Sequence, residues 1–121
     1  MRIIFLPGMQ KKEIYTKTAT EYYQSGIDEL EKERYNSAVI LFFKSLVSLC
    51  DLYMYMKTGE SPSSHSKRFR LAEEKLPDIY FLLDKDFPFY QDSYVQIMSK
   101  ELAEVIKKDV ETVSKKVKVK L

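Results

Sequence analysis

The stretch from Ala38 to Met56 is apolar almost all the way round a helix, and it constrains the fold more than any other part of the chain. At 3.6 residues per turn, its polar side chains Lys44, Ser48, Asp51 and Tyr55 fall on one narrow stripe. A helix of this kind either spans a membrane or lies at the centre of a helical bundle. Because Lys44 and Asp51 would each cost roughly 2.5 to 3.5 kcal/mol near the middle of a bilayer, the stretch predicts a buried bundle helix and no membrane span.

The scarcity of turn-forming residues indicates how the rest of the chain folds. Only three Gly and four Pro punctuate 121 residues, so the elements between them must be long, and long elements here are helices. A chain of this length forms one domain with a substantial core. We therefore expect residues 1–121 to form a single all-α domain, an up-and-down antiparallel bundle of four to five helices built around the central stretch.

Composition excludes several classes of function. His65 is the only histidine and Cys50 the only cysteine, which rules out an intrachain disulfide, a two-thiol site and a metal site with two imidazoles. The sequence has no Gly-rich phosphate loop, zinc-ligand spacing, dinucleotide fingerprint or nucleophile elbow. We expect no metal, no cofactor and no assigned catalytic residue. The opening run from Met1 to Leu6 is too short for a signal-peptide core, so we expect a cytoplasmic protein.

Apolar periodicity predicts the first two helices. The first extends from Gln10 to Glu33, and the second extends from Ser37 to about Lys57, with Gly59 behind it as a C-terminal glycine. Gly26 lies inside the first helix and predicts the close approach of another helix. Asn36 is the expected N-cap of the second helix. The connection between the two is so short that they must form an antiparallel hairpin.

The second half of the chain carries clearer stop signals. Ser63 or Ser64 is expected to cap a third helix, which Pro77 ends while it begins a short fourth one. The sequence DFP at residues 86–88 predicts the end of that helix, with its aspartate capping a long last helix. The last helix has an apolar stripe at spacings of three and four over residues 94–117.

The two ends of the chain carry extended patterns. Residues 1–9 begin with the β-branched run IIFL, which Pro7 and Gly8 stop. Residues 117–121, VKVKL, alternate apolar and basic side chains with a period of two. Two interpretations stay open: frayed ends with an extended C-terminal tail, or a short terminal β ribbon within one chain or between subunits.

The segment SHSKRFR gathers cations at the start of the predicted third helix. Lys67, Arg68 and Arg70 follow His65 within one and a half turns, where backbone N–H groups and the helix dipole favour anions. We expect these four side chains to form a ligand- or anion-binding groove. The alternative is a solvated basic first turn.

The polar stripe of the central helix also allows two interpretations. Lys44 and Asp51 lie two turns apart with Ser48 between them, so the two charges cannot touch directly. One interpretation is a polar network that fixes how the helix sits in the bundle or against a second copy. The other is a small polar pocket formed with His65 or Arg68 of the next helix.

From Lys12 to Val113 the chain resembles the HEPN superfamily of small prokaryotic helical bundles. The resemblance rests on helix order, on the Ala/Phe/Lys pattern of YNSAVILFFKSLVSLCDLYMYMKTG, and on the histidine of SHSKRFR that opens the third helix. It implies an up-and-down bundle that dimerises. The family's ribonuclease members carry an Arg followed, after four to six residues, by a His. In this chain Arg68 and Arg70 follow His65, so that motif is lacking.

What the resemblance implies is a non-catalytic binder of nucleotides or nucleic acid, or the partner of a separately encoded minimal nucleotidyltransferase in a toxin–antitoxin pair. Three functions therefore remain open. The first is a non-catalytic interaction or nucleotide-binding module that acts as a homodimer through its excess apolar helix surface. The second is a divergent ribonuclease that uses His65 with Arg68. The third is a nucleic-acid binder that uses the basic face from Lys107 to Lys120.

Overall fold

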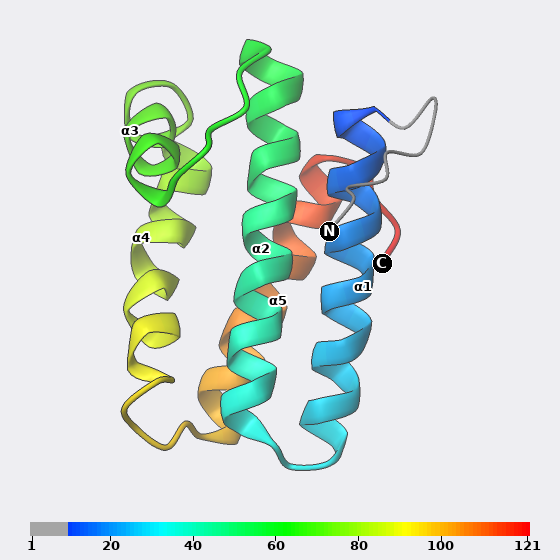
Figure 1. Cartoon of the computed structure of the whole chain (residues 1–121), viewed down its shortest axis with the longest axis vertical. Coiled ribbons are helices and arrows are strands. Elements are labelled where there is room, and N and C mark those ends of the chain that lie inside the picture. The colour runs from blue at the N-terminus through cyan, green and yellow to red at the C-terminus, as the bar shows by residue number, and fades with distance from the viewer. Residues whose placement is uncertain (1–9) are drawn as a thin grey trace, which may run out of the picture.

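The computed structural model of the chain describes residues 10–121, and within them the polypeptide forms five α-helices (Figure 1). The long helices run alternately up and down, and the shorter third helix lies at one end of the bundle, above the start of the fourth helix and beside the second. The predicted all-α, up-and-down bundle is confirmed. The helices are α1 (Lys11–Glu31), α2 (Tyr35–Thr58), α3 (His65–Lys75), α4 (Pro77–Asp92) and α5 (Lys100–Lys116).

The central stretch of the sequence forms the centre of the bundle. α2 contacts each of the other four helices. Among the described residues it is the one helix long and apolar enough to cross a membrane, yet 67% of its most apolar window is buried inside the bundle. Most of its apolar surface is therefore covered within a single chain. Its largest fully buried side chains are Phe42, Phe43, Leu46, Leu49, Leu52 and Met54.

Gly26 marks the closest approach of α1 to α2, as predicted. A Cβ atom at Gly26 would lie 2.6 Å from one ring carbon of Phe42 and 2.7 Å from the next. The Phe42 ring is fully buried and packs against the Tyr23 ring with centroids 5.9 Å apart. The absent side chain thus makes room for a large buried aromatic residue at the helix crossing.

Asn36 is not the N-cap of α2, and that prediction is wrong. The helix begins at Tyr35 after Arg34, so Asn36 lies in its first turn. Its side chain reaches the connection between α4 and α5 instead. The Nδ2 group donates to the carbonyl oxygens of Ser93 and Gln96 at 2.8 and 2.7 Å, and Oδ1 accepts from the backbone N–H of Met98 at 2.9 Å. Because these bonds to distant residues engage the amide group of Asn36, the side chain does not cap the start of α2.

Residues 86–88 do not stop a helix, because α4 continues through Pro88 to Asp92. Pro88 is exposed, as is Asp84 one turn earlier, so the backbone hydrogen bond that Pro88 cannot donate is missing on the solvent side. Phe87 and Tyr90 on either side pack against the core. Asp86 is not a helix cap either, since it is fully buried in the interior.

The last helix is shorter than its apolar pattern indicated. α5 begins at Lys100, after Ser99, whose hydroxyl accepts a hydrogen bond from the backbone N–H of Leu102 at 3.2 Å. Tyr94 and Val95 belong to the preceding connection and are 65% and 79% exposed. The stripe therefore meets the core only from Met98 onward, and within it Val105 is still 40% exposed.

The other helix ends agree with the sequence. Ser64 caps α3 by accepting a hydrogen bond from the backbone N–H of Lys67 at 3.2 Å, Pro77 occupies the first turn of α4, and Gly59 ends α2 in the left-handed region with φ 77°. In the C-terminal tail, Val117 is buried while Lys118 is exposed, so the alternation sorts side chains between core and solvent. No strand forms within residues 10–121, and the N-terminal half of the predicted ribbon lies outside the described residues.

Candidate functional site

A hollow of about 390 Å³ opens between α2, α3 and α4, with one side chain from α1 at its edge. We call it the α2–α3 pocket. Four predicted site residues line it together, namely Lys44, Ser48, His65 and Arg68, and a fifth, Asp51, is bound to Arg68. The structure therefore joins the polar stripe of α2 to the start of α3. The remaining lining residues are Tyr22, Phe43, Val47, Ser63, Ser64 and Tyr90.

Arg68 and Asp51 form a buried ion pair at the inner end of this pocket. The Nε atom of Arg68 donates to Oδ1 of Asp51 at 2.6 Å, and Nη2 donates to Oδ2 at 2.9 Å. The two residues are only 8% and 6% exposed. Burial raises the pKa of the Asp51 carboxyl, while the two hydrogen bonds and the charge of Arg68 act in the opposite direction. The pair satisfies both groups and leaves Nη1 of Arg68 for a further contact.

That further contact is His65, whose Nδ1 atom lies 3.0 Å from Nη1 of Arg68. A guanidinium is only a donor, so Nδ1 must accept and the ring proton must sit on Nε2. Burial lowers the pKa of His65, the charge of Arg68 lowers it further, and Asp51 opposes both. His65 is thus held neutral with an N–H donor at its outer nitrogen.

This arrangement has the opposite polarity to that of a catalytic triad. In a triad a carboxylate accepts the Nδ1 proton, which leaves Nε2 as a base. Here a cation takes the carboxylate's place beside Nδ1, with Asp51 behind it. Nε2 of His65 can therefore donate a hydrogen bond to a ligand, but it cannot remove a proton without a change of tautomer that costs the Arg68 contact.

Aromatic rings pack around His65 on one side of the pocket. The His65 ring centroid lies 5.1 Å from that of Phe87, 6.4 Å from that of Tyr90 and 6.5 Å from that of Phe43. Phe43 and Tyr90 are stacked with centroids 4.7 Å apart. Phe87 does not line the pocket and Phe43 is only 1% exposed, so a flat ring of a ligand would find its contacts on the His65 and Tyr90 rings.

The outer part of the polar stripe makes weaker contacts. Lys44 is exposed, and its ammonium lies 5.9 Å from the centre of the Tyr22 ring on α1. No ion pair joins Lys44 to a carboxylate within the described residues. Ser48 accepts a hydrogen bond from the hydroxyl of Thr18 at 3.1 Å. Lys44 is therefore the cation of this pocket whose charge is not already neutralised.

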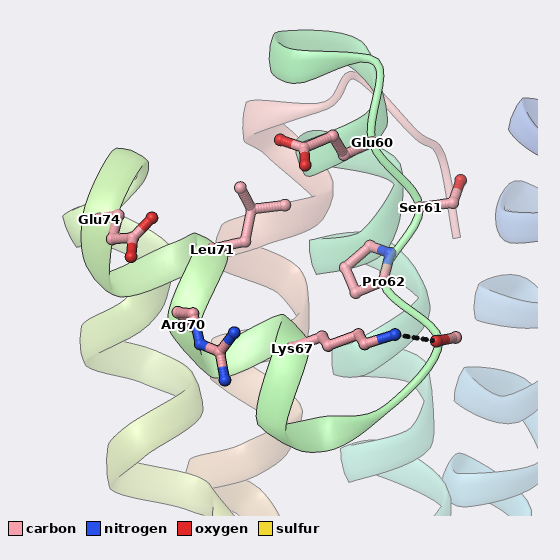
Figure 2. Close-up of a pocket in the computed structure, with 8 residues that line it drawn as sticks. Glu60, Ser61, Pro62, Lys67, Arg70, Leu71 and Glu74 are labelled. Atoms are coloured by element: carbon pink, nitrogen blue, oxygen red, sulfur yellow. Dashed lines mark hydrogen bonds between the residues drawn. The ribbon is translucent and has the colours of Figure 1, made fainter.

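Lys67 and Arg70 do not share this pocket. They line a second hollow of about 430 Å³ on the outer side of α3, under residues 60–63 (Figure 2). Figure 2 shows the two cations on one side of this hollow and the carboxylates of Glu60 and Glu74 on the other. The expectation that Lys67, Arg68 and Arg70 form one groove is not met, because Arg68 points inward to Asp51.

The charges of the second hollow balance, so it does not make an anion site. Two cations face two carboxylates, and Glu60 also pairs with Lys75 at 3.4 Å. The ammonium of Lys67 donates to the hydroxyl of Ser63 at 3.4 Å. Ser63 lines both hollows and separates them.

The basic face of the last helix is partly neutralised within the chain. Lys116 pairs with Asp78 at 3.2 Å and Lys107 with Glu111 at 3.5 Å. Glu111 also accepts a hydrogen bond from the hydroxyl of Tyr23 at 2.5 Å. Ion pairs of this kind lower the positive potential that a nucleic-acid surface needs.

Sequence reasoning missed the aromatic half of the pocket. Tyr22, Phe43 and Tyr90 lie on three different helices, and each fits an apolar stripe of its own helix. No local signal distinguishes these rings from core rings. The proximity of His65 to Arg68 was readable, because residues three apart in a helix lie on one face.

Comparison with models of known protein families gives no match for this chain, and comparison with curated proteins finds no relative. The resemblance to the HEPN superfamily therefore stays a prediction, and function must be argued from the pocket.

Proposed function

We propose that this protein is a non-catalytic binding module of HEPN-like type that holds a nucleotide-class ligand in the α2–α3 pocket and acts as a homodimer in the cytoplasm. The observation that carries the proposal is the contact of Arg68 with Nδ1 of His65 at 3.0 Å. It fixes His65 as a neutral hydrogen-bond donor. A donor suits recognition of a ligand better than abstraction of a proton.

The chemistry of the lining supports a ligand that has both a flat ring and a negative charge. The rings of His65 and Tyr90 offer surface against which a base can stack, and the buried Phe43 ring supports Tyr90 from behind. Lys44 offers an ammonium for a phosphate, and Ser63 offers a hydroxyl. The volume of about 390 Å³ falls within the roughly 300 to 1,000 Å³ of small-molecule sites.

Thermal denaturation with a nucleotide panel tests this proposal. The panel contains nucleosides, nucleoside mono-, di- and triphosphates, inorganic phosphate and polyphosphate. We expect at least one nucleotide to raise the melting temperature, because a ligand that binds only the folded state stabilises it by mass action. Nucleosides and inorganic phosphate should give smaller shifts, since each engages only part of the pocket.

Lys44→Ala is the matched variant, and Lys57→Ala is its control. Both lysines are exposed cations of α2 above a tyrosine ring, at 5.9 Å from Tyr22 and 5.6 Å from Tyr53, but only Lys44 lines the pocket. Lys44→Ala should abolish the shift and Lys57→Ala should keep it. If no nucleotide or polyphosphate shifts the wild type, the ligand proposal fails. A protein partner such as a minimal nucleotidyltransferase then remains, to be tested by co-purification.

The second candidate is a divergent ribonuclease, which the direct contact of His65 with Arg68 favours. In that reading, His65 first takes up a proton at Nδ1, which breaks its contact with Arg68, and the imidazolium then acts as the general acid while Arg68 binds a phosphate oxygen. Two features oppose it: the pairing of Arg68 with Asp51 and the lack of a base at Nε2. It requires RNA cleavage that disappears in His65→Ala, and RNA left intact by the wild type after long incubation would retire it.

A further inference from the structure

The connection between α4 and α5 exposes three large apolar side chains within four residues. Tyr94, Val95 and Ile97 are 65%, 79% and 92% exposed. Single exposed apolar residues are ordinary on a protein surface, but a contiguous group of them marks an interaction surface. We call residues 94–97 the apolar loop.

The apolar loop is held in place from beneath. Asn36 of α2 makes the three hydrogen bonds described above, to Ser93 and Met98 on either side of the loop and to Gln96 within it. Met98 and Ser93, which flank it, are only 5% and 7% exposed. The hydroxyl of Tyr94 lies 3.0 Å from that of Tyr90. A surface that is ordered before binding loses little conformational entropy on association.

A hollow of about 240 Å³ lies directly beside the loop. It is bounded by Ile97 and Met98 on one side and by the α1–α2 turn with the start of α2 on the other. Figure 1 shows that the α1–α2 turn and the α4–α5 connection lie at the same end of the bundle. Glu33 and Arg34, of opposite charge, stand next to each other on its wall. The guanidinium of Arg34 also lies 3.6 Å from the carboxylate of Glu29 on α1. A projecting apolar side chain, a hollow and two side chains of opposite charge are thus neighbours on one surface.

We infer that this end of the bundle binds a second copy of the chain about a twofold axis. In such an interface residue i contacts residue j of the partner, and residue j contacts residue i. The adjacency lets Ile97 of each protomer enter the hollow of the other. It also lets Glu33 of each protomer approach the partner's Arg34, whose side chain is 62% exposed beside Glu29 of its own chain. The twofold axis makes two such contacts between opposite charges.

This inference rests on the homodimer of the proposed function and gives it a surface. The dimer was expected from the apolar excess of α2, but α2 is largely covered within its own chain. The surface at the α4–α5 connection is different, because Tyr94, Val95 and Ile97 stay 65%, 79% and 92% exposed.

Sedimentation equilibrium of the full chain over a concentration series tests the inference. The wild type should be a dimer at the upper concentrations, and Ile97→Asp should raise the dimer dissociation constant at least about tenfold. Phe81→Asp is the control, since Phe81 is 64% exposed on α4 and does not line the hollow. Unchanged melting temperatures would show that both variants fold.

A charge exchange makes the test specific for the twofold arrangement. Glu33→Arg and Arg34→Glu should each weaken the dimer, because like charges would then face each other across the axis, and the double variant should restore it. A wild type that is monomeric at every concentration overturns the inference, as does a dimer that Ile97→Asp leaves unchanged. A monomer that binds another protein through this surface would also overturn it.

The ligand assay separates this inference from the proposed function. If Ile97→Asp is monomeric and still shows the nucleotide-dependent melting shift, both proposals hold, and ligand binding does not require the dimer. If the wild type dimerises as described but no nucleotide shifts its melting temperature, only the ligand proposal fails.

Discussion

The carboxyl group of Asp86 should make the stability of this protein fall steeply between mildly acidic and mildly basic pH. Asp86 of α4 is fully buried, close to Asp109 of α5, which is 7% exposed. The ammonium of Lys85 lies 2.8 Å from Oδ2 of Asp109 and 3.8 Å from Oδ1 of Asp86. Neither carboxyl oxygen of Asp86 has a hydrogen-bond donor among the described groups, so the arrangement makes sense only if Asp86 carries a proton.

Burial raises the pKa of Asp86 from its ordinary value of 3.8 to about 8, helped by the hydrogen bond and the charge of Asp109 and opposed by Lys85. The folded state thus keeps a proton that the unfolded state releases near pH 4. Its stabilising effect is complete below that pH and is lost as the pH rises towards 8. The slope is about 1.4 kcal/mol per pH unit, and over about four units it amounts to roughly 6 kcal/mol. That is a large part of the stability of a small domain.

Asp86→Asn removes this dependence, because an amide keeps a donor for Asp109 but cannot ionise. Urea denaturation followed by circular dichroism between about pH 5 and pH 8 gives the free energy of unfolding of both proteins. We expect the free energy of unfolding of the variant to rise relative to that of the wild type with each pH unit. The titration of His65 is common to both proteins and cancels in the difference.

Asp84→Asn, at an exposed position of the same helix, should keep the wild-type slope. Parallel profiles for the wild type and Asp86→Asn would refute the reasoning, because they would mean that Asp86 is charged or solvated in the folded state.

Two further perturbations test the packing and the pocket. Gly26→Ala should destabilise the protein by about 1 to 2 kcal/mol, since its Cβ would lie 2.6 Å from the Phe42 ring and the overpacking outweighs the gain in helix propensity. Urea denaturation measures this, and Phe42→Leu in the same chain should remove most of the additional cost. Asp51→Ala should cost roughly 3 to 5 kcal/mol, because it leaves Arg68 buried and unpaired. The double variant Asp51→Leu with Arg68→Met should have a melting temperature, measured by calorimetry, much closer to that of the wild type. If the double variant loses as much stability as Asp51→Ala, the ion-pair argument is contradicted.

The helical pattern was readable because each signal is local. Apolar spacing, Ser64 at a helix start, Pro77 in a first turn and Gly59 behind a last turn act through neighbours in sequence. Gly26 was readable for a related reason, since a glycine inside a helix needs a packing partner to offset its cost.

The errors fall where a distant partner outweighed a local preference. Asn36 has the chemistry of an N-cap, but its amide binds the α4–α5 connection. The sequence at residues 86–88 has the chemistry of a stop, but burial of the flanking side chains carries α4 through Pro88.

The sequence alone determined that Ala38 to Met56 is a buried helix in an all-α bundle, because two charges on a nearly continuous apolar surface leave little alternative. Only the tertiary structure decided what the polar stripe faces. It set Arg68 against Asp51 and His65 against Arg68, and it brought Tyr90 from a third helix to complete the pocket. It also left Ile97 exposed beside the α1–α2 turn. The physical reason is that helix periodicity states which side chains share a face, whereas the pairing of faces depends on how all five helices pack together.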